Sequence, residues 1–230
     1  IKTLKSFKLK ILIFAIIFAP LTFSLGIWQV NRANEKIEIL ENYDKLLFSD
    51  PLGLDSDHKN WQPIKTSGKF EDLVIYEDNA ILDGKAGYKI YHLFQNLDNS
   101  YIFVHRGFLE RNLIKNNLPE VEVPEGIKNL EGKVLRRTNN SFVQNVQESD
   151  PRIIQEFDLN YLKERYSSLK NKDIYVYLFN LQEEDKMKFS SIEKPVNMSS
   201  SKHIGYAIQW FGLCLALIIL TIYAYRRKDG

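Results

Sequence analysis

The chain has 230 residues, 44% of them hydrophobic, and a formal net charge of +2. The charge is unevenly divided, because residues 31–202 hold 24 Lys and Arg against 28 Asp and Glu, while the ends are basic. A basic patch for nucleic acid is therefore not indicated. The single cysteine, Cys214, lies in a terminal apolar run, which excludes a disulfide, a thiolate metal site and a thiol nucleophile in residues 31–202.

A basic tail at residues 1–10 is followed by an apolar run at residues 11–30. A run of this length spans a bilayer as a helix, and Pro20 at its centre predicts a kink. A cleaved signal peptide has the same basic start and apolar core. We prefer a transmembrane helix, because no small-x-small cleavage site follows and Trp28 suits an interfacial aromatic belt.

Residues 31–202 are long enough for one domain with its own core. Apolar residues recur at helical spacing over residues 31–48, so we expect the first helix to continue outward. Short segments rich in β-branched and aromatic residues alternating with polar ones follow, and they predict strands. The predicted strands are residues 64–70, 73–78, 87–94, 101–108, 130–137 and 174–179.

Turn and cap signals complete the prediction for this domain. Residues 96–100 supply the turn of a hairpin, and the prolines and acids of residues 118–126 predict a loop. Residues 158–169 are expected to be helical, with Asp158 as the N-cap. The fold class is thus an α+β membrane protein, in which two transmembrane helices flank one mostly antiparallel β domain with one or two helices. A partly closed barrel is compatible with this pattern.

The second apolar run covers residues 203–225 and is followed by a basic tail at residues 226–230. Basic flanks stay in the cytoplasm, so both tails are expected there. The domain at 31–202 would then be periplasmic, and the two helices would lie in the inner (plasma) membrane of a bacterium. Ionisable residues are rare in membrane helices and usually serve a function there. His203 is therefore a candidate functional residue.

Motifs for enzymatic chemistry are absent from the sequence. It contains no phosphate-binding loop, dinucleotide fingerprint, nucleophile elbow or zinc-type His/Cys cluster, so we predict that the chain is not an enzyme. Two glycine-containing segments, 82–88 and 104–109, are interpreted as a turn and as a strand end with a bulge. Cys214 is interpreted as a small apolar filler rather than a metal ligand. The other histidines, His58, His92 and His105, are expected at the surface or in strands.

Four segments in order resemble the signatures of the surfeit-locus family of cytochrome oxidase assembly factors. They are Gly26-Ile27-Trp28-Gln29 with Arg32 and Lys36, Asp83-Gly84-Lys85-Ala86-Gly87-Tyr88, Arg106-Gly107-Phe108, and His203-Ile204-Gly205-Tyr206-Ala207-Ile208-Gln209-Trp210-Phe211. Phe108 stands where the family more usually has Trp. Ser201 stands where it usually has Asn, and either side chain can cap a helix.

The resemblance implies a membrane-bound factor that binds haem a transiently at the outer membrane face and assists its insertion into cytochrome c oxidase subunit I. Other implied partners are the haem a synthesis enzymes and membrane lipid, and no nucleic acid. His203 would be the axial iron ligand. The other implied cofactor-binding residues are Tyr206 and Trp210 beside the macrocycle, Gln29 and Trp28 on the opposite wall, and Arg32 (or Lys202) at a propionate.

Alternatives stay open at several of these positions. His203 alone is equally compatible with a polar residue at a helix N-terminus, Trp210 with helix packing, and Arg32 with a positive flank. The main alternative for the whole chain is a structural chaperone that stabilises an oxidase intermediate and binds no cofactor. An enzyme of haem a synthesis is less well supported, since it would need several membrane histidines or an acidic metal motif.

Overall fold

A computed structural model describes residues 2–54, 58–111, 118–137, 148, 150–182 and 185–226, with side chains from Lys8 onward. The chain divides into two compact units. The helical unit comprises the chain up to Tyr43 and from Pro195, and the β domain comprises Asp44–Lys194. The β domain is narrower than the predicted 31–202, because the outer turns of the first helix group with the helical unit.

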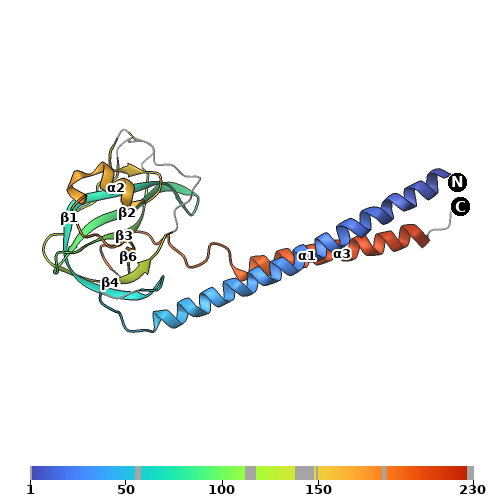
Figure 1. The fold of residues 1–230 in the computed structure, drawn as a ribbon, viewed down its shortest axis with the longest axis horizontal. Coiled ribbons are helices and arrows are strands. Elements are labelled where there is room, and N and C mark those ends of the chain that lie inside the picture. The colour runs from blue at the N-terminus through green and yellow to red at the C-terminus, as the bar shows by residue number, and fades with distance from the viewer. Residues whose placement is uncertain are drawn as a thin grey trace. The chain divides into compact units, whose positions relative to one another are not determined.

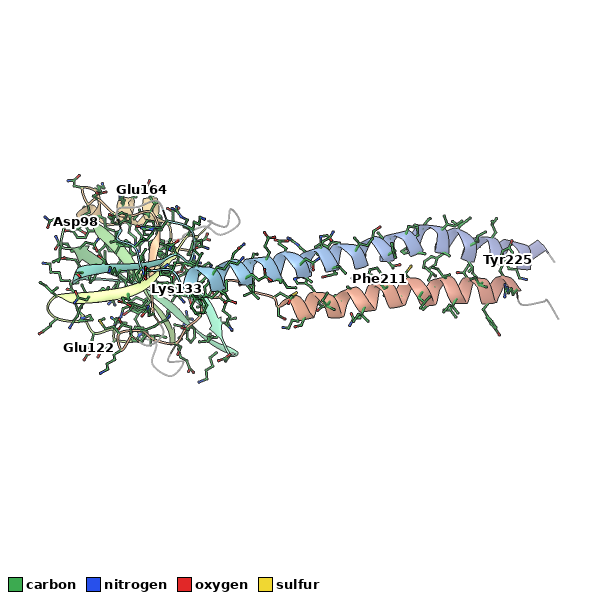
Figure 2. The ribbon with its side chains drawn as sticks, turned by 90° about the horizontal axis from the view of Figure 1, so that it is seen from below. Asp98, Glu122, Lys133, Glu164, Phe211 and Tyr225 are labelled. Carbon is green, nitrogen blue, oxygen red and sulfur yellow. The ribbon has the colours of Figure 1, made fainter. Side chains whose placement is uncertain are left out.

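Two long helices form the helical unit. They are α1 (Lys2–Leu47) and α3 (Ser200–Arg226), which run antiparallel side by side (Figure 1, Figure 2). The predicted outward continuation of the first helix is confirmed, since α1 is one helix as far as Leu47, with Pro20 inside it. Both helices are long and apolar enough to cross a membrane. The expected pair of apolar helices flanking a β-rich domain is therefore present.

Six strands build the β domain. They are β1 (Pro63–Leu82), β2 (Lys85–Asn96), β3 (Tyr101–Glu110), β4 (Lys128–Leu135), β5 (Ile153–Ile154) and β6 (Leu178–Leu181), joined by α2 (Leu159–Arg165) and a 3₁₀ turn, η1 (Ser167–Leu169). Pairing runs from β1 through β2, β3, β6 and β4 back to β1, so these five strands form a closed ring (Figure 1). The ring closes at Gly68, which pairs with Asn96 of β2 and Lys128 of β4.

Both faces of the ring are covered by apolar side chains, which explains the continuous apolar runs in its strands. On β3, for example, Ile102 and Val104 pack in one core cluster, while Phe103 between them packs in a second. The second cluster includes Leu162 of α2 and Leu169 of η1, so these short helices cover one face of the ring. The expected alternation of apolar and polar residues is thus wrong for β2 and β3, whose residues are buried almost without interruption.

Several predicted boundaries differ from the structure. The strands expected at 64–70 and 73–78 are one strand, β1, whose register shifts between Phe70 and Val74. The last strand begins at Leu178, and Ile174 makes only an isolated bridge to Tyr101. The helix expected at 158–169 ends at Arg165, although Asp158 is its N-cap as predicted. The short strand β5 was not predicted, since two residues carry no periodicity.

The two glycine-containing segments lie side by side on β2 and β3. Asp83 and Gly84 form the tight turn between β1 and β2, both with positive φ. On β3 the register with β2 shifts, which leaves Arg106 as the extra residue of a bulge. The turn and the bulge are confirmed, but the bulge lies inside β3 rather than at its end. Gly107 follows with a φ of 107°. The backbone N–H of the next residue, Phe108, donates to the Ser190 carbonyl.

Candidate functional site

The contact between α1 and α3 combines small residues with aromatic ones, and the ring centres of Phe23 on α1 and Phe211 on α3 lie 5.4 Å apart. Ala33 of α1 and Ala207 and Cys214 of α3 are buried in this contact. Gly26 faces the ring of Phe211, and a Cβ at this position would lie 2.5 Å from a ring carbon. A side chain at position 26 would therefore force the Phe211 ring to move.

His203 and Gln29 meet at this helix contact. His203 lies in the first turn of α3, which begins at Ser200, and is only 8% exposed. Its Nδ1 lies 2.8 Å from Oε1 of Gln29 on α1, and this hydrogen bond links residues 174 positions apart in the sequence. The two candidate residues from opposite ends of the chain thus lie in direct contact.

The second ring nitrogen of His203, Nε2, is buried and has no hydrogen-bond partner among the residues that the structure describes. A buried polar atom without a partner is uncommon and unfavourable. An imidazole nitrogen is also a frequent ligand of haem iron. The residues present therefore fit a haem group in this respect, since one nitrogen of His203 is held by protein and the other is left for a ligand.

The aromatic candidates lie at different places on the helices. Trp210 is half-buried, whereas Tyr206 and Trp28 remain 45% and 50% exposed. Tyr206 and Trp28 therefore present apolar surface outside the helix contact, while Trp210 and Ala207 lie closer to it.

Arg32 offers the positive charge nearest to Trp28 among the predicted site residues. Its guanidinium carbon lies 5.8 Å from the centre of the Trp28 ring, and its Nη1 donates to Glu35 Oε2 at 2.5 Å. Both side chains of this ion pair are about half exposed, at 45% and 46%. An exposed pair of this kind is weak, so Arg32 can exchange its partner at little cost.

The remaining histidines lie in the β domain and are buried. His92 and His105 are strand residues as expected, while His58 is buried rather than at the surface. Burial lowers the pKa of His92 and of His105 to about 4, so both rings are neutral. Within the described parts of the chain, no three His, Cys, Asp or Glu side chains are grouped so that they could hold a metal ion.

Several charged groups inside the β domain are paired around Glu77. Arg137 donates to both carboxylate oxygens of Glu77, at 2.9 and 2.6 Å, and Glu77 also accepts from the amide of Phe157. Lys89 bridges Glu77 at 3.6 Å and Glu193 at 2.7 Å. A buried carboxylate with this many partners is well satisfied, which indicates a structural cluster that ties Glu193 to the ring.

Comparison with known proteins connects these features to a family. The model of the SURF1 family matches residues 16–215. A "SURF1-like protein" of Rickettsia felis is 28% identical over 221 residues, which cover 89% of this chain and 92% of that protein. A "SURF1-like protein" of Rickettsia prowazekii is 26% identical over 235 residues, covering 90% and 86%. A third, from Rickettsia conorii, is 24% identical over 221 residues, covering 89% and 86%.

Proposed function

The chain belongs to the SURF1 family, the surfeit-locus family that its signatures resemble, and we propose that it binds haem a during assembly of cytochrome oxidase. The family consists of cytochrome oxidase assembly factors, which are not enzymes. The observation that carries the haem proposal is the buried, unpartnered Nε2 of His203 in a contact between two apolar helices.

In this proposal each part of the site meets one need of the cofactor. Haem a is an apolar macrocycle whose iron accepts an axial ligand and whose propionates are negative. His203 supplies the ligand nitrogen, and Trp28, Tyr206 and Trp210 supply aromatic surface. Gln29 lies on the opposite helix and contacts His203. Arg32 would supply the positive charge for a propionate in place of Glu35.

The proposed location follows from the helices and their flanks. Both basic ends lie in the cytoplasm, the helices cross the bacterial inner membrane, and the β domain is periplasmic. Arg227 and Lys228 of the C-terminal flank lie outside the described residues. The site would then be at the outer membrane face, where the chain receives haem a from the synthesis enzymes and passes it to oxidase subunit I.

A structural chaperone without cofactor is the second candidate function. One observation favours it: His203 is only 8% exposed, and its bond to Gln29 is what a polar pair that fastens two membrane helices would make. In that case His203 acts through helix packing alone. The haem proposal requires instead that the helix contact opens enough for Nε2 to reach the iron.

A visible spectrum separates the two functions. The full chain is co-expressed with the haem a synthesis enzymes and purified in detergent as wild type, His203→Ala and Gln209→Ala, an exposed residue of the same helix. We expect a haem a band in the wild type and in Gln209→Ala, and its loss or shift in His203→Ala. Equal haem in all three proteins would place the ligand elsewhere, and no haem in any of them would favour the structural chaperone.

A further inference from the structure

We propose that Gln29 is a positioning residue, which holds the ring of His203 in the tautomer whose Nε2 can bind iron. The inference deepens the proposed function and rests on it. It starts from the 2.8 Å contact between His203 Nδ1 and Gln29 Oε1. An amide oxygen only accepts hydrogen bonds, so in this arrangement Nδ1 is the donor and carries the proton. A neutral imidazole has one N–H, and therefore Nε2 carries the lone pair.

The helix contact fixes Gln29 from both sides. Gly26, one turn earlier on α1, lies against Phe211, and Ala33, one turn later, is 0% exposed. Gln29 thus belongs to the face of α1 that packs on α3. Because this face of α1 is packed, the Gln29 side chain can place its Oε1 in only a few positions. The hydrogen bond to His203 therefore has a defined direction.

The partner of His203 is an amide and not a carboxylate. Histidines that bind metals usually donate their second N–H to a carboxylate, a carbonyl or water, and this bond fixes the tautomer and the ring orientation. A carboxylate would add a charge next to the apolar part of the helices, where charges are costly. A glutamine gives the orientation without the charge, and it raises the basicity of the ligand less. A ligand of moderate strength suits a carrier, which must release its haem.

Nitrogen NMR of haem-free protein tests the tautomer directly. The full chain is labelled with ¹⁵N-histidine in detergent, and the His203 signals are assigned by comparison with His203→Ala. We expect a protonated Nδ1 and an unprotonated Nε2 in the wild type. Gln29→Leu should lose this preference, Gln29→Glu should keep it because a carboxylate also accepts, and Gln209→Leu should not change it.

Haem binding by the same variants tests the consequence. Loss of a residue that orients a ligand typically lowers metal affinity roughly 10- to 100-fold. We expect a decrease of this size in haem a affinity for Gln29→Leu, and none for Gln209→Leu. Gln29→Glu should retain binding, which separates loss of the acceptor from damage to the helix contact.

The outcomes are distinguishable. Protonated Nε2 in the wild type would overturn the inference, since the amide would then donate to Nδ1. Unchanged tautomer and affinity in Gln29→Leu would overturn it while leaving the haem proposal intact. A wild type that binds no haem would overturn both, whatever its tautomer.

Discussion

His203 could be singled out from the sequence because it lies beside a membrane-length apolar run, while only the family resemblance favours an iron ligand over a polar residue at a helix N-terminus. Gln29 could be placed at a similar depth, because each residue lies near the outer end of its run. Their hydrogen bond could not be predicted. It depends on how each helix is rotated about its axis, and that rotation is set by the contacts of Gly26 and Ala207. The same rotation leaves Tyr206 45% exposed, whereas His203 is 8% exposed.

The buried histidines of the β domain predict a dependence of its stability on pH. His92 donates from Nε2 to the Glu71 carbonyl and accepts at Nδ1 from Arg106, so a second proton would face a guanidinium. His105 bonds Asn180 through Nδ1, near Glu193, Lys89 and Glu77. Both rings are therefore held neutral in the folded domain.

The sign follows from the two pKa values. The pKa of each ring is about 4 in the folded state and 6.5 in the unfolded state, so the unfolded chain binds more protons between these values. The free energy of unfolding should fall as the pH is lowered from 7, by about 2 kcal/mol for each histidine at pH 5. Urea unfolding of the full chain at pH 7 and pH 5 measures this decrease in the free energy of unfolding. In His105→Gln the decrease should be half as large. A constant free energy of unfolding from pH 7 to pH 5 would contradict this account.

Among the elements, β3 and the segment after β6 are held together at Arg106 and Gly107. Arg106 donates from Nε to the Met187 carbonyl at 2.8 Å, and its guanidinium lies 4.8 Å from the Phe189 ring centre. The amide of Phe108 donates to the Ser190 carbonyl at 2.8 Å. The segment that leads toward α3 is thus fastened to the ring at the bulge, which gives the Arg-Gly pair a structural reason.

Gly107→Ala should loosen this attachment. A Cβ at position 107 would lie 2.6 Å from the Ser190 carbonyl oxygen, and the φ of 107° is strained for alanine. Gly126→Ala is the matched control, because its φ is 75° and no atom of the described residues lies within 4 Å of the added Cβ. We expect Gly107→Ala to destabilise the domain by roughly 1–3 kcal/mol more than the control, since overpacking has costs of this size. Equal urea midpoints for the two variants would show that the attachment is unimportant.

For the whole molecule, the order of the longer elements was predictable and a partly closed barrel was compatible with the sequence, but the strand pairing that closes the ring was not predictable. The hairpin of β2 and β3 is local and has a clear turn signal at residues 96–100. Ring closure depends on the parallel pairing of β3 with β6 and on β4 pairing with both β6 and β1, contacts between segments far apart in the chain. Short-range patterns do not encode such partners, and β6 has only four residues.

In the proposed function His203 holds haem a on its way to the oxidase, in addition to fastening two helices. Membranes from cells that lack the chain, complemented with wild type or with His203→Ala, test it most directly through the haem a content of oxidase subunit I. The account predicts full haem a with the wild type and a marked loss with His203→Ala at equal amounts of inserted protein. Equal haem a contents would contradict it and would assign the chain to structural assistance alone.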